Sequence, residues 1–81
     1  MTHVTLYGKP GCHLCEEARA VVDEVRRRRP FELEEVDITR DPALEARYRE
    51  RIPVIAIDGR EALELVIESP DFERCLASMA P

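Results

Sequence analysis

Long apolar runs, a surplus of basic residues and an even set of cysteines are all missing from this sequence of 81 residues. No stretch approaches the roughly 18 apolar residues of a membrane helix, and no basic segment followed by an apolar run opens the chain, so we expect neither a membrane span nor a signal peptide. The net charge of −5 argues against general nucleic-acid binding, which requires a basic surface. We therefore expect a cytoplasmic protein with no membrane or nucleic-acid partner.

Three cysteines are too few, and odd in number, for a framework of structural disulfides. Cys12 and Cys15 form a Cys-x-x-Cys pair, which in a reducing compartment indicates redox chemistry or metal binding more often than a structural bridge. The third, Cys75, falls on the apolar stripe of a predicted helix, where we expect a buried, inert thiol. The chain length predicts a single domain over residues 1–81.

The apolar pattern predicts seven elements in the order β-α-β-α-β-β-α. A first helix is expected from about residue 14 through the arginines that precede Pro30, because apolar residues recur at offsets of three and four and proline stops a helix. Two more are expected after Asp41-Pro42 and after Ser69-Pro70, because a capping side chain followed by proline is typical of a helix start. The first two strands flank a helix, so they should be parallel with a right-handed crossover. Strands are expected over residues 3–7, 31–38, 53–57 and 62–67.

Within the predicted second strand, the parity of the apolar residues changes. Successive side chains of a strand point to opposite faces. Phe31 and Leu33 share one parity, whereas Val36 and Ile38 share the other. This change of face predicts an irregularity, or a strand end, near residues 34–35.

The Cys-x-x-Cys pair lies where a loop containing glycine and proline becomes a helix. Free backbone N–H groups at a helix N-terminus stabilise an anion, and only the thiolate form of cysteine attacks a disulfide. Cys12 stands at the helix start, whereas Cys15 lies one turn along and is better protected. We therefore expect Cys12 to be the nucleophile, more exposed and more acidic, and Cys15 to be the resolving thiol.

Half of a zinc site is the alternative interpretation of the pair. Zinc needs about four ligands, and the remaining candidates are His3, His13 and Cys75. None of these forms a second ligand pair at the spacing of a zinc knuckle. Redox chemistry is therefore preferred, and we predict no stoichiometric zinc.

Residues 7–18, which read Tyr-Gly-Lys-Pro-Gly-Cys-His-Leu-Cys-Glu-Glu-Ala, resemble the active-site segment of glutaredoxins, and more closely that of the short glutaredoxin-like proteins. The resemblance implies a thioredoxin-like α/β fold, with a four-stranded mixed sheet and helices on both faces. Further matching segments follow at the expected separations: Asp37-Ile38, Asp41-Pro42, Ile52-Pro53-Val54-Ile55 and Asp58-Gly59.

The resemblance also implies roles for residues outside the pair. It implies that Pro53 is cis and faces the cysteines, and that Lys9 and the backbone of Ile52 contact glutathione. A proline at residue 53 has no N–H, so we expect both the N–H and the carbonyl of Ile52 to be free to pair with a substrate backbone. From charge alone, Lys9 is a cation near the thiolate that could also meet a carboxylate, or an ordinary solvated loop lysine.

Several positions depart from the family pattern. Glutaredoxins usually carry Gly-Gly-x-Asp at the start of the last helix to hold the glutamyl end of glutathione, but residues 68–72 here read Glu-Ser-Pro-Asp-Phe. Pro70 removes a donor and Asp71 repels a carboxylate, so we expect weak glutathione binding. Gly11 and Leu6 stand where thioredoxins carry tryptophan and a buried aspartate, so the chain is a standard member of neither group.

His13 and a set of arginines have two interpretations each. A protonated His13 beside the first cysteine would favour the thiolate, or the ring faces solvent with no role. The arginines could meet an acidic partner, but a salt-bridged surface is the preferred interpretation. They are Arg47, Arg49, Arg51 and Arg60.

These observations predict a dithiol thiol–disulfide oxidoreductase without a bound cofactor, in which Cys12 attacks a disulfide and Cys15 resolves the mixed disulfide. The expected substrates are protein or small-molecule disulfides. The candidate electron donors are glutathione and a reductase, and we expect a monomer. A non-catalytic module that binds a partner or a metal is the main alternative, and a glutathione-dependent iron–sulfur carrier is a third.

Overall fold

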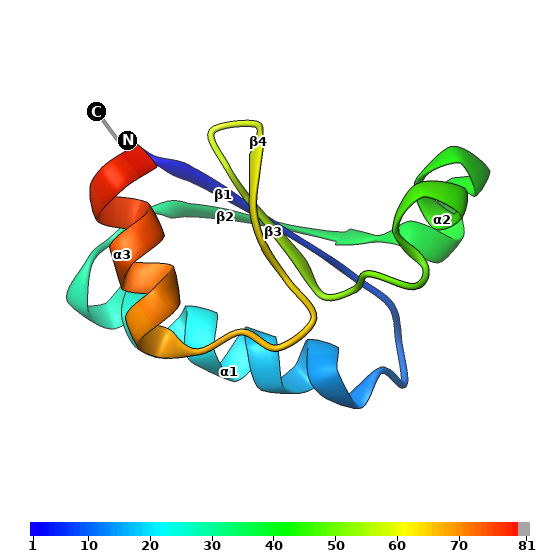
Figure 1. The fold of residues 1–81 in the computed structure, drawn as a ribbon, viewed down its shortest axis with the longest axis horizontal. Helices are drawn as coiled ribbons and strands as arrows, with labels where there is room; N and C mark the ends of the chain where they lie inside the picture. The colour runs from blue at the N-terminus through cyan, green and yellow to red at the C-terminus, as the bar shows by residue number, and fades with distance from the viewer. Residues whose placement is uncertain (80–81) are drawn as a thin grey trace.

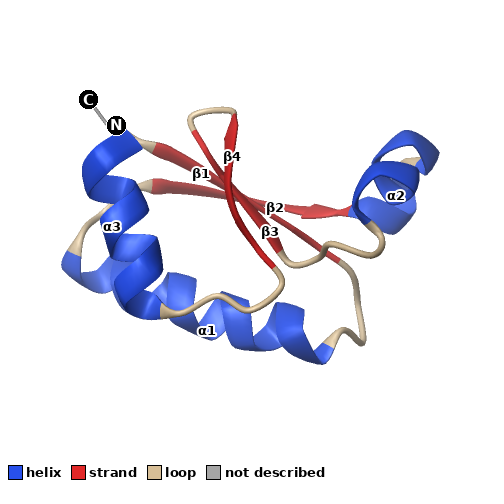
Figure 2. Ribbon diagram, in the orientation of Figure 1, coloured by secondary structure: helices blue, strands red, loops and turns tan. Residues whose placement is uncertain are grey.

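The computed structural model describes residues 1–79 as a four-stranded sheet flanked by helices (Figures 1 and 2). The predicted order of elements is confirmed. The elements are β1 (His3–Gly8), α1 (His13–Arg28), β2 (Glu32–Asp37), the short 3-10 helix η1 (Ile38–Arg40), α2 (Pro42–Tyr48), β3 (Val54–Ile57), β4 (Arg60–Glu64) and α3 (Ser69–Met79).

The sheet has the strand order β2-β1-β3-β4 and is mixed. Strands β1 and β2 are parallel, as expected for strands joined through α1, whereas β1–β3 and β3–β4 are antiparallel. The β3–β4 hairpin turns at Asp58 and Gly59, which both have positive φ. This topology places the C-terminal end of β1, and therefore the start of α1, between β2 and β3.

Helices cover both faces of the sheet, as predicted. Helices α1 and α3 pack on one face over a core that includes Val4, Val22 and Phe72. Helix α2 packs on the other face in a smaller cluster with Tyr48 and Val54. Figure 1 shows α2 at the far end of the molecule from α3. Within residues 1–79, none of the helices is both long and apolar enough to cross a membrane.

The irregularity predicted near residues 34–35 is wrong. Strand β2 pairs with β1 in one unbroken register from Glu32 to Asp37. The parity changes because both faces of the strand are covered. Leu33 pairs with Val4 and packs on the α1 and α3 face, whereas Val36 pairs with Tyr7, which stacks on the α2 face.

The last strand begins and ends earlier than predicted. It covers Arg60–Glu64, and residues 65–67 lie outside it. Leu65 has a φ of 68° and donates its N–H to the Pro53 carbonyl at 2.8 Å, which turns the chain away from the ladder. Leu65 and Val66 are consequently exposed, and Ile67 returns to the core. The apolar residues continue through residues 65–67 after the strand has ended at Glu64, so the apolar pattern predicted a strand end that was too late.

Local capping signals predicted the start of α2 correctly. The Asp41 side chain accepts a hydrogen bond from the Ala43 N–H at 2.9 Å, and Pro42 occupies the first helical position. Proline is suited to that position, because its missing N–H has no intrahelical partner there.

Candidate functional site

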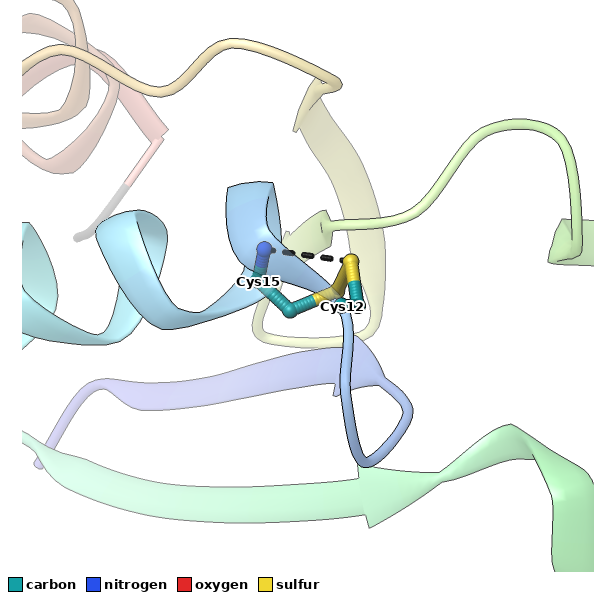
Figure 3. Close-up of a disulfide and its surroundings, with 2 residues drawn as sticks. All are labelled: Cys12 and Cys15. Carbon is teal, nitrogen blue, oxygen red and sulfur yellow. Dashed lines mark hydrogen bonds between the residues drawn. A yellow bond between two sulfur atoms is a disulfide. The ribbon is translucent and has the colours of Figure 1, made fainter.

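Cys12 and Cys15 form a disulfide at the start of α1 (Figure 3). Their Cα atoms lie 5.2 Å apart, within the range that a disulfide spans. Cys12 is the N-cap residue, and its sulfur accepts a hydrogen bond from the Cys15 N–H at 3.2 Å. The N–H that caps the helix therefore points at the sulfur of the first cysteine, where it would stabilise a thiolate.

The two sulfurs have different environments. Cys12 is half-buried, whereas Cys15 is only 9% exposed and packs beside Ile52 and Val54. Gly8 is close to the second cysteine, since a Cβ atom at Gly8 would lie 3.1 Å from the Cys15 sulfur. Cys12 is thus the outer member of the pair, in agreement with the order of exposure expected from the helix start.

The Ile52–Pro53 peptide bond is cis, as the resemblance implied. Ile52 and Val54, on either side of Pro53, belong to the cluster that contains Cys15 and against which Cys12 packs. The segment before β3 therefore lies beside the cysteine pair.

The expectation that both backbone groups of Ile52 are free is wrong. The Ile52 N–H donates to the Tyr48 carbonyl at 3.0 Å, and the Arg51 N–H donates to the same oxygen at 2.8 Å. Helix α2 ends at Tyr48, so its last carbonyls need donors from the chain that follows. Of the two backbone groups of Ile52, the carbonyl alone has no backbone hydrogen-bond partner among the described loop residues.

Lys9 and His13 lie near the pair without contacting it through any hydrogen bond among residues 1–79. Lys9 is exposed and lines the cleft described below. The His13 Nε2 atom lies 2.8 Å from a carboxylate oxygen of Glu17, and the ring is 84% exposed. A protonated His13 would share its charge with Glu17, so its effect on a Cys12 thiolate is weakened.

A polar network that the sequence analysis missed ties α2 to β4. The Tyr48 hydroxyl donates to Glu61 at 2.9 Å, and Arg51 bridges Glu61 and Glu64. Arg47 joins the network through Glu61, at 3.1 Å, so the salt-bridged interpretation is confirmed for Arg47 and Arg51. This network, the α2–β4 clamp, holds the segment that leads into Ile52 and Pro53.

The clamp shifts the pKa of three of its members, and hydrogen bonds to Glu64 and Glu61 raise the pKa of Arg51. Arg51, and next the Tyr48 hydroxyl, lower the pKa of Glu61 through hydrogen bonds. Burial, with the hydrogen bond to Glu61 as a further cause, raises the pKa of Tyr48. The ring of Tyr48 also stacks on Tyr7, with centroids 4.6 Å apart. No local pattern could have revealed this clamp, because its ion pairs join residues 10 to 14 positions apart across a loop and a hairpin.

A cleft of about 510 Å³ is the second feature that the sequence did not reveal. It lies between the first turns of α1 and the C-terminal ends of β1 and β2. Cys15 lines this cleft, but Cys12 does not. The other lining residues are Leu6, Gly8, Lys9, Pro10, Glu16, Arg19, Glu35, Val36 and Asp37.

The described part of the chain holds no group of three or more His, Cys, Asp or Glu side chains placed to bind a metal. His3, one of the candidate ligands, is hydrogen-bonded to Glu34 at 3.2 Å on the β1–β2 pair. Cys75 is half-buried on α3 and packs against the larger core.

Comparison with known proteins supports the assignment made from the residues. The model of the family described as Glutaredoxin-like domain (DUF836) matches residues 3–77. A search of curated proteins finds none that matches this chain.

Solved structures agree with the family match. The structural-genomics target protein XcR50 from X. campestris is 34% identical, with 96% of this chain and 99% of that one covered, at a TM-score of 0.78. Protein Ne2328 from Nitrosomonas europaea is 29% identical over 90% of this chain and 88% of that one, also at 0.78.

A mutant thioredoxin from Halobacterium salinarum is 18% identical, covers 99% of this chain and 75% of that one, and superposes with a TM-score of 0.73. At this identity the likeness concerns the fold alone, which is thioredoxin-like. With its Cys12–Cys15 disulfide at the start of α1 and the family match over residues 3–77, the chain belongs to the glutaredoxin-like domain family.

Proposed function

We propose that this protein is a dithiol thiol–disulfide oxidoreductase. The observation that carries the proposal is the position of the Cys12 sulfur, which caps α1 and accepts the Cys15 N–H at 3.2 Å. An N–H donor and the positive end of the helix both favour the thiolate over the thiol. A merely structural disulfide would need no such donor.

In the proposed reaction, the Cys12 thiolate attacks one sulfur of a substrate disulfide. A new bond joins Cys12 to that sulfur, and the other substrate sulfur leaves as a thiolate that takes a proton from water. The Cys15 thiol loses its proton and attacks Cys12, which forms the internal disulfide and releases the second substrate thiolate. Two electrons pass from the protein to the substrate, and reduction of the pair restores the dithiol.

The expected substrates are protein or small-molecule disulfides, with no bound cofactor. Glutathione is a candidate donor that we expect to bind weakly. Asp71 in the first turn of α3 forms an ion pair with Arg74 at 3.3 Å, and Pro70 offers no donor. Each missing charge-assisted hydrogen bond weakens binding by about 1.5–3 kcal/mol. A reductase is therefore the preferred donor, and we propose a monomer in the cytoplasm.

The test compares three single variants in the reduction of a protein disulfide, with insulin as the substrate. Cys12→Ser should abolish turnover. Cys15→Ser should still attack but should accumulate a mixed disulfide, because the resolving thiol is missing. Cys75→Ser is the matched control and should turn over like the unmodified protein.

The alternative is a non-catalytic module that binds a partner or a metal. It predicts that Cys12→Ser and the unmodified protein show the same low rate with insulin. One zinc ion per chain, lost on Cys12→Ser, would also support it. Either result would overturn the proposed function.

A further inference from the structure

We propose that Arg51 is a positioning residue for the attack of Cys12 on protein disulfides. Through Glu61 and Glu64 it holds residues 51–53, which lie beside the cysteine pair, against the end of β4, and a polypeptide substrate needs that segment in place. The inference rests on the proposed function and adds to it a residue remote from the two sulfurs. It predicts that the reaction with protein disulfides depends on Arg51, whereas the reaction with small reagents does not.

The first argument is the place of Arg51 in the chain. It directly precedes Ile52, which belongs to the cluster that contains Cys15 and against which Cys12 packs. A polypeptide bonded to the Cys12 sulfur must therefore pass beside Ile52. Any displacement of residues 51–53 changes the surface that such a substrate meets, so a contact that fixes this segment acts on the docking of the substrate.

The second argument is that the Arg51 side chain supplies a link that the sheet does not. Strand β3 begins at Val54, so residues 51–53 lie outside the ladder that joins β3 to β4. Two links join this segment to the end of β4. The Arg51 Nη2 atom lies 3.0 Å from a carboxylate oxygen of Glu64, and the Pro53 carbonyl accepts the Leu65 N–H at 2.8 Å. Arg51 therefore fixes the segment where the ladder has not yet begun.

The third argument is the conformation of Leu65, the residue after Glu64. Its φ of 68° lies in the left-handed region, which a residue with a Cβ atom adopts only where the surrounding contacts impose it. Burial of the side chain does not impose it, because Leu65 is 42% exposed. The contacts on either side do, since Arg51 holds Glu64 and Pro53 accepts the Leu65 N–H. A costly backbone conformation near a redox site favours a function for the contacts that maintain it.

The fourth argument is the type of side chain. One guanidinium reaches two carboxylates, Glu61 and Glu64, and lies over the Tyr48 ring at 5.3 Å from its centroid. The planar fork of arginine can make these contacts together, whereas the ammonium of lysine is a single point of charge. Tyr48 is only 4% exposed and stacks on Tyr7, so it gives Arg51 a rigid support. Exposed ion pairs contribute little to stability, so positioning explains this arrangement better than stability does.

The reactivity of the Cys12 thiolate is set elsewhere. Its sulfur accepts the Cys15 N–H at 3.2 Å, at the start of α1. Within residues 1–79, the side-chain hydrogen bonds of Arg51 go to Glu61 and Glu64 on β4 and not to either cysteine. The rate with a small electrophile reports the thiolate itself and should not depend on Arg51. Docking of a polypeptide should depend on it.

The test compares Arg51→Met, which keeps an apolar stem over Tyr48 and removes the charge, with Arg28→Met. Arg28 forms an ion pair with Glu73 at 2.7 Å between α1 and α3 and is the matched control. Each reduced protein is mixed with excess insulin at a range of concentrations, and the loss of free thiol is followed. In Arg51→Met the half-saturating insulin concentration should rise about tenfold with the limiting rate nearly unchanged, which indicates lost docking. Arg28→Met should behave like the unmodified protein.

Alkylation of Cys12 by iodoacetamide is the second readout, because a general disturbance of the site would change it as well. Its rate, measured by mass spectrometry of the Cys12 peptide, should change by less than about twofold in Arg51→Met. An unchanged half-saturating concentration, an equal rise in Arg28→Met, or a parallel fall in the alkylation rate would each overturn the proposal. Failure of the proposed function looks different, because the unmodified protein itself would then not react with insulin.

A double-mutant cycle tests the route through β4. Glu64→Ala alone should raise the half-saturating insulin concentration, and the double variant with Arg51→Met should be no worse than Arg51→Met, because both changes remove the same link. Additive effects would overturn the assignment of that link. If thermal unfolding shows that Arg51→Met does not fold, Arg51→Lys decides. Its single ammonium should give a rise of about threefold, and no rise would overturn the proposal.

Discussion

The two faces of the sheet are built by different physics. The α1 and α3 face is closed by apolar packing, with Phe31 and Phe72 in an edge-to-face contact whose centroids lie 5.7 Å apart. The α2 face has a smaller apolar cluster, and charged side chains of the α2–β4 clamp tie it to the sheet. Apolar burial contributes far more to stability than exposed ion pairs. The first face should therefore set stability, whereas the second positions the segment beside the cysteines.

The largest expected loss of stability comes from a substitution in the apolar core under α1 and α3. Phe72→Ala removes a side chain that is fully buried and should lower the free energy of unfolding by about 3–5 kcal/mol. Urea denaturation measures this loss. Val66→Ala is the control, because Val66 is 65% exposed and should change stability by less than about 0.5 kcal/mol. Equal losses in the two variants would contradict the assignment of the core.

The second prediction concerns the cysteine pair at the start of α1, beside the segment that the clamp holds. A variant that retains Cys12, made by Cys15→Ser, should titrate at least about one pH unit lower than a variant that retains Cys15, made by Cys12→Ser. The ultraviolet absorbance of the thiolate follows the titration of each variant, and both variants carry Cys75→Ser so that only one thiol titrates. If the retained Cys12 titrates no lower than the retained Cys15, the assignment of the nucleophile is wrong.

The third prediction sharpens the comparison inside the clamp. Tyr48→Phe removes the hydroxyl that donates to Glu61 at 2.9 Å and should lower the free energy of unfolding by about 1 kcal/mol. Tyr7→Phe is the matched control, because the Tyr7 hydroxyl has no hydrogen-bond partner among the described side chains. Chemical denaturation of both variants should separate them, and a loss as large in Tyr7→Phe would show that the clamp contributes nothing specific.

The smallest expected effect is the pH dependence of the clamp. Arg51 lowers the pKa of Glu61, so the folded state binds a proton at Glu61 more weakly than the unfolded state does. The resulting stability is present above the pKa of Glu61 in the unfolded chain, about 4.3, and is lost as the pH falls through the lower pKa of Glu61 in the folded protein.

The measurement compares the unmodified protein with Glu61→Gln between about pH 5 and pH 3 by urea denaturation. The unmodified protein should lose slightly more stability over this range than the variant, and added salt should shrink the difference because the groups are exposed. Asp37, whose pKa is lowered by Thr39, contributes in the same direction to both proteins and cancels. Identical slopes would show that Glu61 is not stabilised as a carboxylate.

Local sequence signals predicted much of this molecule. The Asp41-Pro42 cap, the glycine at the β3–β4 turn and the cysteine at the helix start all act within a few residues. The strand end at Glu64 was predicted wrongly, because a positive φ at Leu65 and a hydrogen bond to Pro53 terminate the strand. That bond joins residues 12 positions apart in the chain, so no local pattern carries it.

The sequence by itself determined the order of the elements and the place of Cys12 at the start of α1, because capping, turn chemistry and apolar periodicity depend on near neighbours. Tertiary structure alone decided three other features. These are the two-sided burial of β2, the capture of the Ile52 N–H by Tyr48, and the cleft that opens on Cys15 but not on Cys12. Each feature arises where elements far apart in the chain pack together. The choice among competing hydrogen-bond partners, and the space left between side chains, depend on that packing and not on near neighbours in the sequence.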